Sequence, residues 1–198
     1  IKNNGGTTAD TDAALYLDSA TVGHMEHIRL ISNARSGYFN TINALRIYDI
    51  AVNGGSIYDD MEFISATDTE IYGLSLSESD EGTNGGFCFK ACWNVLIDGV
   101  YVEHNLSVNP FTIGDTGQPT RGFTIKGLRS GTPSVASSKA IILAQLSSMG
   151  ISIEDFSIIR TGTGAHTSGW IELAEVSNVH LKNINIQNIS GTPSAANL

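Results

Sequence analysis

Several acidic and basic residues recur at one place relative to runs of alternating apolar residues. Glu78, His104 and Arg160 each stand two residues after the last apolar position of such a run, and Glu103 lies beside His104. If successive runs lie side by side, Glu78 with Glu103 or His104 can act as a general acid and base pair, and Arg160 can hold an acidic substrate group. The alternative interpretation is a solvated polar edge whose turns differ in length.

A second group of carboxylates lies earlier in the chain. Asp59 and Asp60 are adjacent in SIYDDMEF, and Glu62 is predicted to point outward from the strand that follows. Glu172 is predicted to lie on the same face of a later strand. Because a pair of carboxylates can share acid and base work, Asp59 and Asp60 are the alternative catalytic candidates.

Three tyrosines, Tyr48, Tyr72 and Tyr101, are predicted to point outward from the apolar runs. A flat ring can stack on a ligand and place a hydroxyl for hydrogen bonding, so these residues are candidates for substrate binding. Stacking of one ring on the next, or burial against a second subunit, explains them equally well. Trp93 is predicted to be structural at a corner, whereas Trp170 follows TGTGAHTSG, a loop that could close over a ligand.

The two cysteines, Cys88 and Cys92, lie in the strand-like run GGFCFKAC. At about 3.3 Å per residue, an extended i to i+4 pair is about 13 Å apart, and a disulfide needs Cα atoms within about 7 Å. We therefore predict free, half-buried thiols. No histidine stands near them at zinc-ligand spacing, and no aspartate cluster has calcium-site spacing, so we predict no metal and no cofactor.

An internal repeat must position all of these candidates. The run Val95, Ile97, Val100 and Val102 alternates apolar with polar residues around a two-residue turn. Six copies of this template start at Leu45, Thr69, Val95, Phe123, Ile151 and Val179, which are 24, 26, 28, 28 and 28 residues apart. Just before the third apolar position, every copy has a residue type that tolerates positive φ in a sharp bend: Asp49, Gly73, Gly99, Gly127, Asp155 or Asn183.

A second, shorter strand signal precedes most copies by eight residues. Its paired apolar positions are Met61 and Phe63, Phe87 and Phe89, Leu143 and Gln145, and Ile171 and Leu173, with Phe111 and Ile113 displaced by the insert GDTGQP. One such coil is too small to bury its own apolar face, whereas coils stacked about 4.8 Å apart share a continuous core. We therefore predict an all-β fold, a right-handed parallel β-helix forming a single-stranded solenoid of about six rungs.

The outward positions of the template support this stacking. In the predicted register, one outward column reads Tyr48, Tyr72, Asp98, Lys126, Glu154 and Lys182. Opposite charges on neighbouring strands attract by a few tenths of a kcal/mol, and like charges repel. The column predicts a tyrosine pair followed by a charge ladder, and ordinary surface charge is the alternative explanation.

Composition and charge restrict the classes of partner. Only 16% of the residues are Asp, Glu, Lys or Arg, and 11 basic against 20 acidic residues give a formal net charge of −9. Because binders of duplex nucleic acid or of anionic membranes need clustered Lys and Arg, both classes are disfavoured. No apolar run approaches the roughly 20 residues of a membrane span, so no membrane insertion is predicted.

The N-terminal segment GGTTADTDAALYLDSA is predicted to form a cap. Asp10 or Thr11 can begin a short helix that carries Ala13, Ala14 and Leu17 on one face. We expect residues 1–24 to be the cap and residues 25–198 the β-helix. The chain stops after a rung at NISGTPSAANL, and we expect a missing C-terminal region or a partner to cover that end.

This opening segment, together with rung sequences such as NVLIDGVYVEHN, resembles the pectate-lyase-like β-helix superfamily. The resemblance is strongest to bacteriophage tailspikes and polysaccharide depolymerases, although the usual Asp-Asp-Thr is replaced by Ala9, Asp10 and Thr11. It implies a homotrimer in the virion tail, with other tail proteins as partners, that binds and degrades a bacterial surface polysaccharide as a glycosidase or a lyase.

Two alternatives stay open. The first is a non-catalytic virion adhesin or spacer, and the second is a secreted pectinase-like enzyme. Adjacent aspartates resemble those of polygalacturonase-type hydrolases, but the Gly-His-Gly and Arg-Ile-Lys motifs of that group are absent from the sequence. The aspartate pair Asp59 and Asp60 therefore adds little support to the pectinase alternative.

Overall fold

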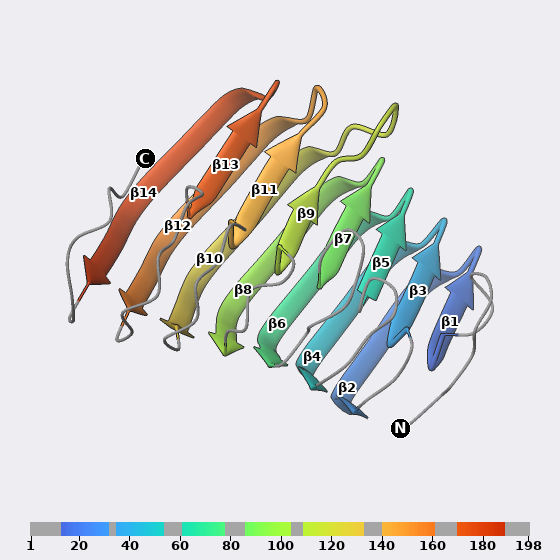
Figure 1. Cartoon of the computed structure of the whole chain (residues 1–198). Helices are drawn as coiled ribbons and strands as arrows, with labels where there is room; N and C mark the ends of the chain where they lie inside the picture. The colour runs from blue at the N-terminus through green and yellow to red at the C-terminus, as the bar shows by residue number, and fades with distance from the viewer. Residues whose placement is uncertain are drawn as a thin grey trace.

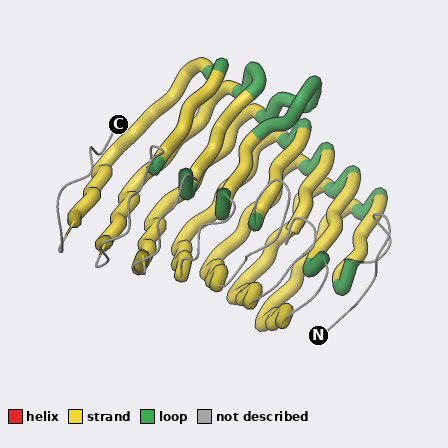
Figure 2. The backbone as a smooth tube through the Cα atoms, in the orientation of Figure 1, coloured by secondary structure: helices red, strands yellow, loops and turns green. Residues whose placement is uncertain are grey.

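The computed structural model describes residues 13–31, 35–53, 61–77, 86–103, 109–132, 140–160 and 170–188. Within these ranges, every regular element is a β-strand (Figure 2). The strands form two parallel sheets of seven, and successive coils stack from β1 and β2 at one end to β13 and β14 at the other (Figure 1). The predicted fold class, an all-β parallel β-helix, is confirmed.

Each coil contributes one short and one long strand. The described short strands are β1 (Leu15–Asp18), β3 (Gly37–Asn40), β5 (Met61–Ile64), β7 (Phe87–Lys90), β9 (Phe111–Ile113), β11 (Ile142–Gln145) and β13 (Ile171–Ala174). The described long strands are β2 (Thr21–Ile31), β4 (Asn43–Asn53), β6 (Thr67–Ser77), β8 (Trp93–Glu103), β10 (Arg121–Thr132), β12 (Met149–Arg160) and β14 (Ser177–Asn188). We call the two layers the short sheet and the long sheet.

The template of the sequence predicts the register of the long sheet correctly. Val95 pairs with Thr69 on one side and with Phe123 on the other, and Ile151 pairs with Phe123 and Val179. A single inward column therefore runs through all the described coils: Met25, Ile47, Ile71, Ile97, Ile125, Ile153 and Leu181. The repeat spacing carries this information because residues one coil apart occupy equivalent positions.

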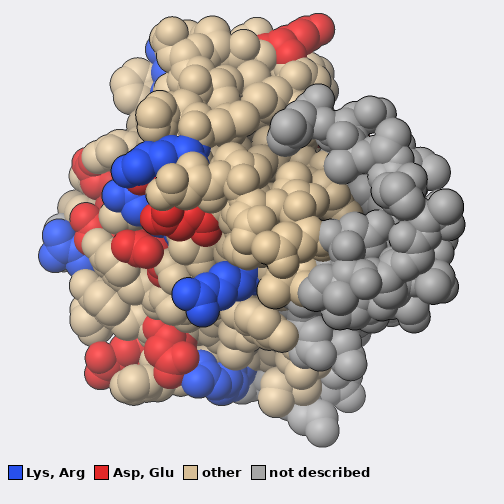
Figure 3. Space-filling view, turned by 90° about the vertical axis from the view of Figure 1, so that its left-hand side faces the viewer, with Lys and Arg blue, Asp and Glu red and all other residues tan. Residues whose placement is uncertain are grey.

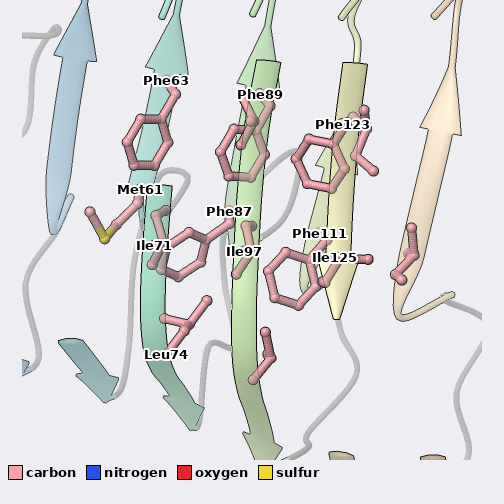
Figure 4. Close-up of a cluster of buried hydrophobic side chains, with 14 of the residues drawn as sticks. Met61, Phe63, Ile71, Leu74, Phe87, Phe89, Ile97, Phe111, Phe123 and Ile125 are labelled. Atoms are coloured by element: carbon pink, nitrogen blue, oxygen red, sulfur yellow. The ribbon is translucent and has the colours of Figure 1, made fainter. Parts of the chain in front are cut away.

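Stacked aromatic rings fill the core between the sheets. Phe39 stacks on Phe63 at a centroid distance of 4.7 Å, and Phe63 stacks on Phe89 at 4.9 Å. Phe89 then meets Phe123 of the long sheet edge to face at 5.0 Å (Figure 4). These phenylalanines are fully buried, and such ring pairs stabilise a core beyond the effect of area alone.

The predicted bends are confirmed at every copy of the template. Asp49, Gly73, Gly99, Gly127, Asp155 and Asn183 all have φ between 54° and 74°. The first coil makes the same bend at His27, with φ of 54°. A second column of positive φ near the start of the long strands was not predicted, although five of its members are Asp, Asn or Gly: Asp68, Asn94, Gly122, Gly150 and Asn178.

The predicted capping helix is wrong over the residues that the structure describes. Leu15–Asp18 is β1, which pairs in parallel with β3, so the solenoid begins before residue 25. The first coil was missed because Gly23 occupies its first inward position, where a Cβ would lie 2.8 Å from Leu45 Cδ1. The Thr11 and Asp10 cap residues lie outside the described ranges.

One strand is shifted by one residue from its prediction. The buried positions of β11 are Ile142 and Ala144, not Leu143 and Gln145. Three residues join β11 to β12, from Leu146 to Ser148, where two residues join β7 to β8. Since inward and outward positions alternate along a strand, this extra residue moves every side chain of β11 to the other face.

Candidate functional site

Two outer faces of the solenoid carry the polar side chains that could act on a ligand. One is the outer face of the long sheet, and the other is the outer face of the short sheet. Seen from the left-hand side of Figure 1, basic and acidic side chains are interspersed on a mostly uncharged surface (Figure 3). The two faces differ in the burial of their ion pairs: Arg46 on the long sheet is exposed, whereas Glu62 and Lys90 on the short sheet are nearly buried.

The predicted catalytic residues are only partly placed by the structure. Glu78, His104, Asp59 and Asp60 lie outside the described residues. The backbone of Glu103, at the end of β8, pairs with Ser77 of β6 and Gly131 of β10.

Arg160 ends β12, where its backbone pairs with Thr132 and Asn188. Because the side chains of Glu103 and Arg160 are not described, the register places these two positions at one end of the long sheet and gives no distance between their functional groups.

Tyr48 and Tyr72 stack on each other instead of standing free. Their ring centroids are 5.1 Å apart with an interplanar angle of 10°, and His24 lies 5.2 Å from Tyr48 on the other side. The Tyr72 hydroxyl donates a hydrogen bond to Glu70 at 3.3 Å, and burial, followed by the negative charge of Glu70, raises the pKa of Tyr72. Neighbouring coils therefore cover both faces of the Tyr48 ring and one face of the Tyr72 ring, which matches the stacking interpretation of the sequence.

Tyr101 lies in a different environment. It follows the bend at Gly99, in register with Ser75 and Arg129, and 48% of its surface is exposed. The three tyrosines therefore do not form one stripe, because Tyr48 and Tyr72 precede the bend of their strands and Tyr101 follows it.

The first residue of the same strand, Trp93, directly follows the corner between β7 and β8, and it is 55% exposed. The guanidinium carbon of Arg121, on the next coil, lies 5.4 Å from the centre of its indole ring. Sequence reasoning missed this pair as a functional candidate, although the aromatic and basic residues are one repeat apart. In the register of the repeat, Arg121 pairs with Trp93, and this pairing is the signal that could have identified the two residues.

The long sheet also carries paired charges between coils. Arg46 Nε donates to Glu70 Oε2 at 2.8 Å, and this hydrogen bond raises the pKa of Arg46. The predicted charge ladder has the expected register, with Lys126 between Asp98 and Glu154. Among the described residues of that ladder, the pair that reaches ion-pair distance is Glu154 with Lys182, at 3.8 Å.

A further cluster lies at the bend of the first two coils. Arg29 donates from Nη2 to both carboxylate oxygens of Asp49 at 3.0 Å, and His27 Nδ1 lies 2.9 Å from Asp49 Oδ2. The hydrogen bond with His27, and next that with Arg29, lower the pKa of Asp49. This exposed cluster ties β2 to β4 and orders the first bend.

The outer face of the short sheet holds a buried ionic network. Glu62 lies outward from the hydrophobic core, as predicted, yet it is only 5% exposed. Its carboxylate accepts from Lys90 Nζ at 2.6 Å and lies 3.4 Å from Arg35 Nη2. Lys90 also lies 3.2 Å from Asp115. Two positive and two negative groups thus neutralise one another, and three of them, Arg35, Glu62 and Lys90, have side chains that are at most 12% exposed, whereas Asp115 is 36% exposed.

The sequence did not predict this network. Arg35 precedes β3, Lys90 ends β7 and Asp115 follows β9, so these three residues occupy different positions in their coils. Comparing equivalent positions of the repeat therefore does not show that these three residues are neighbours. The adjacent outward positions Cys88 and Thr112 are buried as well.

Both cysteines are free, as predicted, and both are fully buried instead of half-buried. The Cys92 thiol donates to the carbonyl oxygen of Phe63 at 3.3 Å, and burial raises the pKa of Cys92 to about 12. A thiol with such a pKa stays protonated at neutral pH and is a poor nucleophile. Cys92 is therefore a packing residue at the corner between β7 and β8.

Neither a metal cluster nor a membrane helix is present in the described part of the chain. No group of three or more His, Cys, Asp or Glu there is arranged to hold a metal ion. None of the described segments forms a helix that could cross a membrane. Comparison with family models, with curated proteins and with solved structures finds no match to this chain.

Proposed function

We propose that this solenoid belongs to a bacteriophage tailspike or tail fibre that binds a bacterial surface polysaccharide and degrades it. The observation that carries the binding half is the exposure of Trp93 and Tyr101. They are the two most exposed large apolar side chains in the described ranges, at 55% and 48%, and both belong to β8. Exposed aromatic rings with a polar tip are suited to stack on sugar rings.

The contrast with Tyr48 and Tyr72 supports this choice. Tyr48 lies between the rings of His24 and Tyr72, and Tyr48 in turn covers one face of Tyr72. Trp93 and Tyr101 project from a strand that is hydrogen-bonded on both sides, by β6 and β10. A ring on such a rigid element loses little conformational freedom when it binds a ligand.

The degrading half of the proposal concerns the end of the long sheet. Ser77 and Glu103 are paired, and the catalytic candidates Glu78 and His104 directly follow them in sequence. Carboxylates about 5 to 9 Å apart hydrolyse a glycosidic bond, whereas a base and a neutralised uronate carboxylate support elimination. Glu78, Glu103 and His104 are therefore proposed as the acid and base set, with Asp59 and Asp60 as the second choice.

Binding is tested with a panel of purified capsular polysaccharides and lipopolysaccharide glycans immobilised on a biosensor. We expect at least one glycan to bind, and we expect the variants Trp93→Ala and Tyr101→Ala to weaken its binding. Tyr16→Ala is the matched control, because Tyr16 is 44% exposed but lies on the short sheet, stacked on Tyr38. Loss of binding in the control as well, or binding unchanged in both test variants, would contradict the proposed surface.

Catalysis is tested on the glycans that bind. New reducing ends without ultraviolet absorbance indicate hydrolysis, and reducing ends with the absorbance of an unsaturated uronate indicate elimination. Glu78→Gln, Glu103→Gln and His104→Ala should reduce product formation while binding persists. A bound glycan from which neither product forms would refute the enzymatic half.

A non-catalytic virion adhesin or spacer is the second candidate. The observation that favours it is the number of polar groups engaged between coils, such as Arg46 with Glu70, Asn94 with Asp68 and Asn183 with Asp155. Contacts of this kind stiffen a rod without acting on a ligand. For a spacer, triple substitution of Glu78, Glu103 and His104 by alanine leaves host attachment unchanged.

The proposal also includes assembly as a homotrimer in the virion tail. Light scattering coupled to size-exclusion chromatography measures the mass in solution directly. A mass of one chain at micromolar concentration would contradict the trimer, and it would leave the saccharide-binding test unaffected.

A further inference from the structure

The arginines of this acidic protein fall into two groups. Three of the five whose side chains are described lie within 4 Å of a carboxylate: Arg29 with Asp49, Arg35 with Glu62, and Arg46 with Glu70. In the described part of the chain, no carboxylate lies that close to Arg121 or Arg129, although acidic residues outnumber basic ones by 20 to 11. Both are exposed.

These two arginines stand beside the two exposed aromatic residues. Arg121 and Arg129 belong to β10, and they are in register with Trp93 and Tyr101 of β8. Arg121 lies 5.4 Å from the centre of the Trp93 ring. The coincidence is specific, because the two most exposed large apolar side chains of the described ranges each neighbour an arginine that lacks a carboxylate partner there.

The chemistry of the pair indicates the kind of ligand. A guanidinium presents a planar fork of N–H donors that matches a carboxylate in bidentate geometry, and it can stack on an aromatic face at the same time. An adjacent aromatic ring offers an apolar surface for a sugar ring. A neutral sugar would use the ring and leave the guanidinium without a charged partner, whereas a uronic acid uses both groups.

We infer that Trp93 with Arg121, and Tyr101 with Arg129, are two subsites for acidic sugars, so the saccharide bound by this solenoid contains uronic acid. This inference rests on the proposed saccharide-binding function and names its ligand class. The two subsites are separate, since bends at Asn94 and Gly99 lie between Trp93 and Tyr101. Eight residues of strand span at most about 26 Å, so a polysaccharide with repeated acidic units can occupy both.

The overall charge sharpens the expectation. A protein of net charge −9 repels a polyanion at long range, whereas the two arginines attract it locally. Salt shortens the Debye length and so weakens interactions between exposed charges, those over long distances most of all. Binding should therefore depend on the individual guanidinium groups and not on net charge alone. A control that removes a positive charge elsewhere on the long sheet separates the two effects.

The test compares acidic capsular polysaccharides with the same polymers after chemical reduction of their carboxyl groups. Affinity is measured on a biosensor, and binding is also followed by tryptophan fluorescence. The variant Trp93→Phe identifies the part of the fluorescence change that comes from Trp93, because the other tryptophan, Trp170, is buried. Arg121→Gln and Arg129→Gln should each weaken binding of the acidic polymer about tenfold, as expected for the loss of a charge-assisted hydrogen bond. Neither substitution should alter binding of the reduced polymer.

Arg46→Gln is the matched control, because it removes an exposed positive charge that is already paired with Glu70. The inference is supported if this control binds like the parent protein while the two test variants lose affinity for the acidic polymer. Equal affinity of the parent protein for acidic and reduced polymers, or equal loss in Arg46→Gln, overturns the inference and leaves saccharide binding intact. Absence of binding to every glycan overturns the proposed function and this inference with it.

Discussion

The outer faces of the two sheets differ in how they hold charge. On the long sheet, Arg46 and Glu70 form an ion pair in which the arginine side chain is 60% exposed. On the short sheet, Glu62 and Lys90 form one in which the side chains are 6% and 12% exposed. Both pairs link neighbouring coils, but only the buried pair must have its charges balanced for the chain to fold, because water cannot solvate a group left alone. An outward direction from the core therefore does not imply exposure.

This difference bears on the proposed binding surface. On the short sheet, Glu62 is buried and forms ion pairs with both Arg35 and Lys90. The long sheet keeps Trp93 and Tyr101 in solvent. The proposed binding surface lies on the long sheet, while ion pairs between coils occur on both faces.

The largest predicted effect is on the buried network. Glu62→Ala leaves Arg35 and Lys90 with one fewer carboxylate in a site that water hardly reaches, so it should destabilise the protein by about 3 to 5 kcal/mol. Glu70→Ala, which removes the exposed partner of Arg46, should change stability by no more than about 1 kcal/mol. Chemical unfolding followed by circular dichroism measures both. Similar losses for the two variants would abolish the distinction between the faces.

A medium effect is expected at the bend of the long sheet. Gly99 has φ of 74°, and a Cβ there would be 3.7 Å from the nearest backbone atom, which is ordinary contact. Gly99→Ala should therefore cost about 1 to 2 kcal/mol through backbone conformation alone. Gly99→Asn should cost less, because Asn183 adopts this conformation in the last described coil. The variants are compared by their denaturant midpoints of unfolding. If the two midpoints are the same, steric contact of the new side chain, and not the positive φ, determines the loss of stability at Gly99.

A smaller effect is expected from the exposed carboxylate at the first bend. The pKa of Asp49 is lowered below its ordinary value of 3.8, so the ionised form is favoured by folding. Its contribution to stability is present above that value and is lost as the pH falls through the lower, folded-state pKa. The parent protein should lose more stability than Asp49→Asn on acidification through this range. Parallel pH profiles of unfolding midpoints for the two proteins would argue against the contribution.

The smallest effect concerns the charge ladder. Lys126→Glu places a negative charge between Asp98 and Glu154 and should destabilise the solenoid by a few tenths to about 1 kcal/mol. Added salt should reduce the loss by screening, whereas the neutral variant Lys126→Gln should respond weakly to salt. Thermal melting at low and high ionic strength checks this. A loss that is independent of salt would mean that the side chain acts through packing.

Much of the coil geometry could be predicted from residue types at repeated positions. The inward column that includes Ile71 and Ile97, and the bends at Gly73 and Gly99, follow from periodicity because these features depend on residues within one coil and on its nearest neighbour. The errors occurred where the period was broken. Gly23 occupies the first inward position of the first coil, so that coil lacks the apolar residue by which the template is recognised. One additional residue in the linker after β11 shifts the inward positions of that strand by one.

The candidate site was less accessible to sequence reasoning. Tyr48 and Tyr101 are both outward aromatic residues in the template, and only the folded structure distinguishes a stacked ring from an exposed one. Trp93 is predicted to be structural, and the structure adds that it contacts Arg121 of the next coil and is the most exposed large apolar residue of the described ranges. The positions of Glu78, His104, Asp59 and Asp60 stay predictions.

The sequence by itself therefore determined the parallel coils, their register and the residues at the main bends, since each is repeated and local. Only the tertiary structure decided which outward side chains are covered and which meet solvent. Glu62 is buried by an arrangement that brings Arg35, Lys90 and Asp115 together from three coils, and no single repeat contains that information. Burial of an outward group depends on contacts between distant parts of the chain, and periodicity does not encode those contacts.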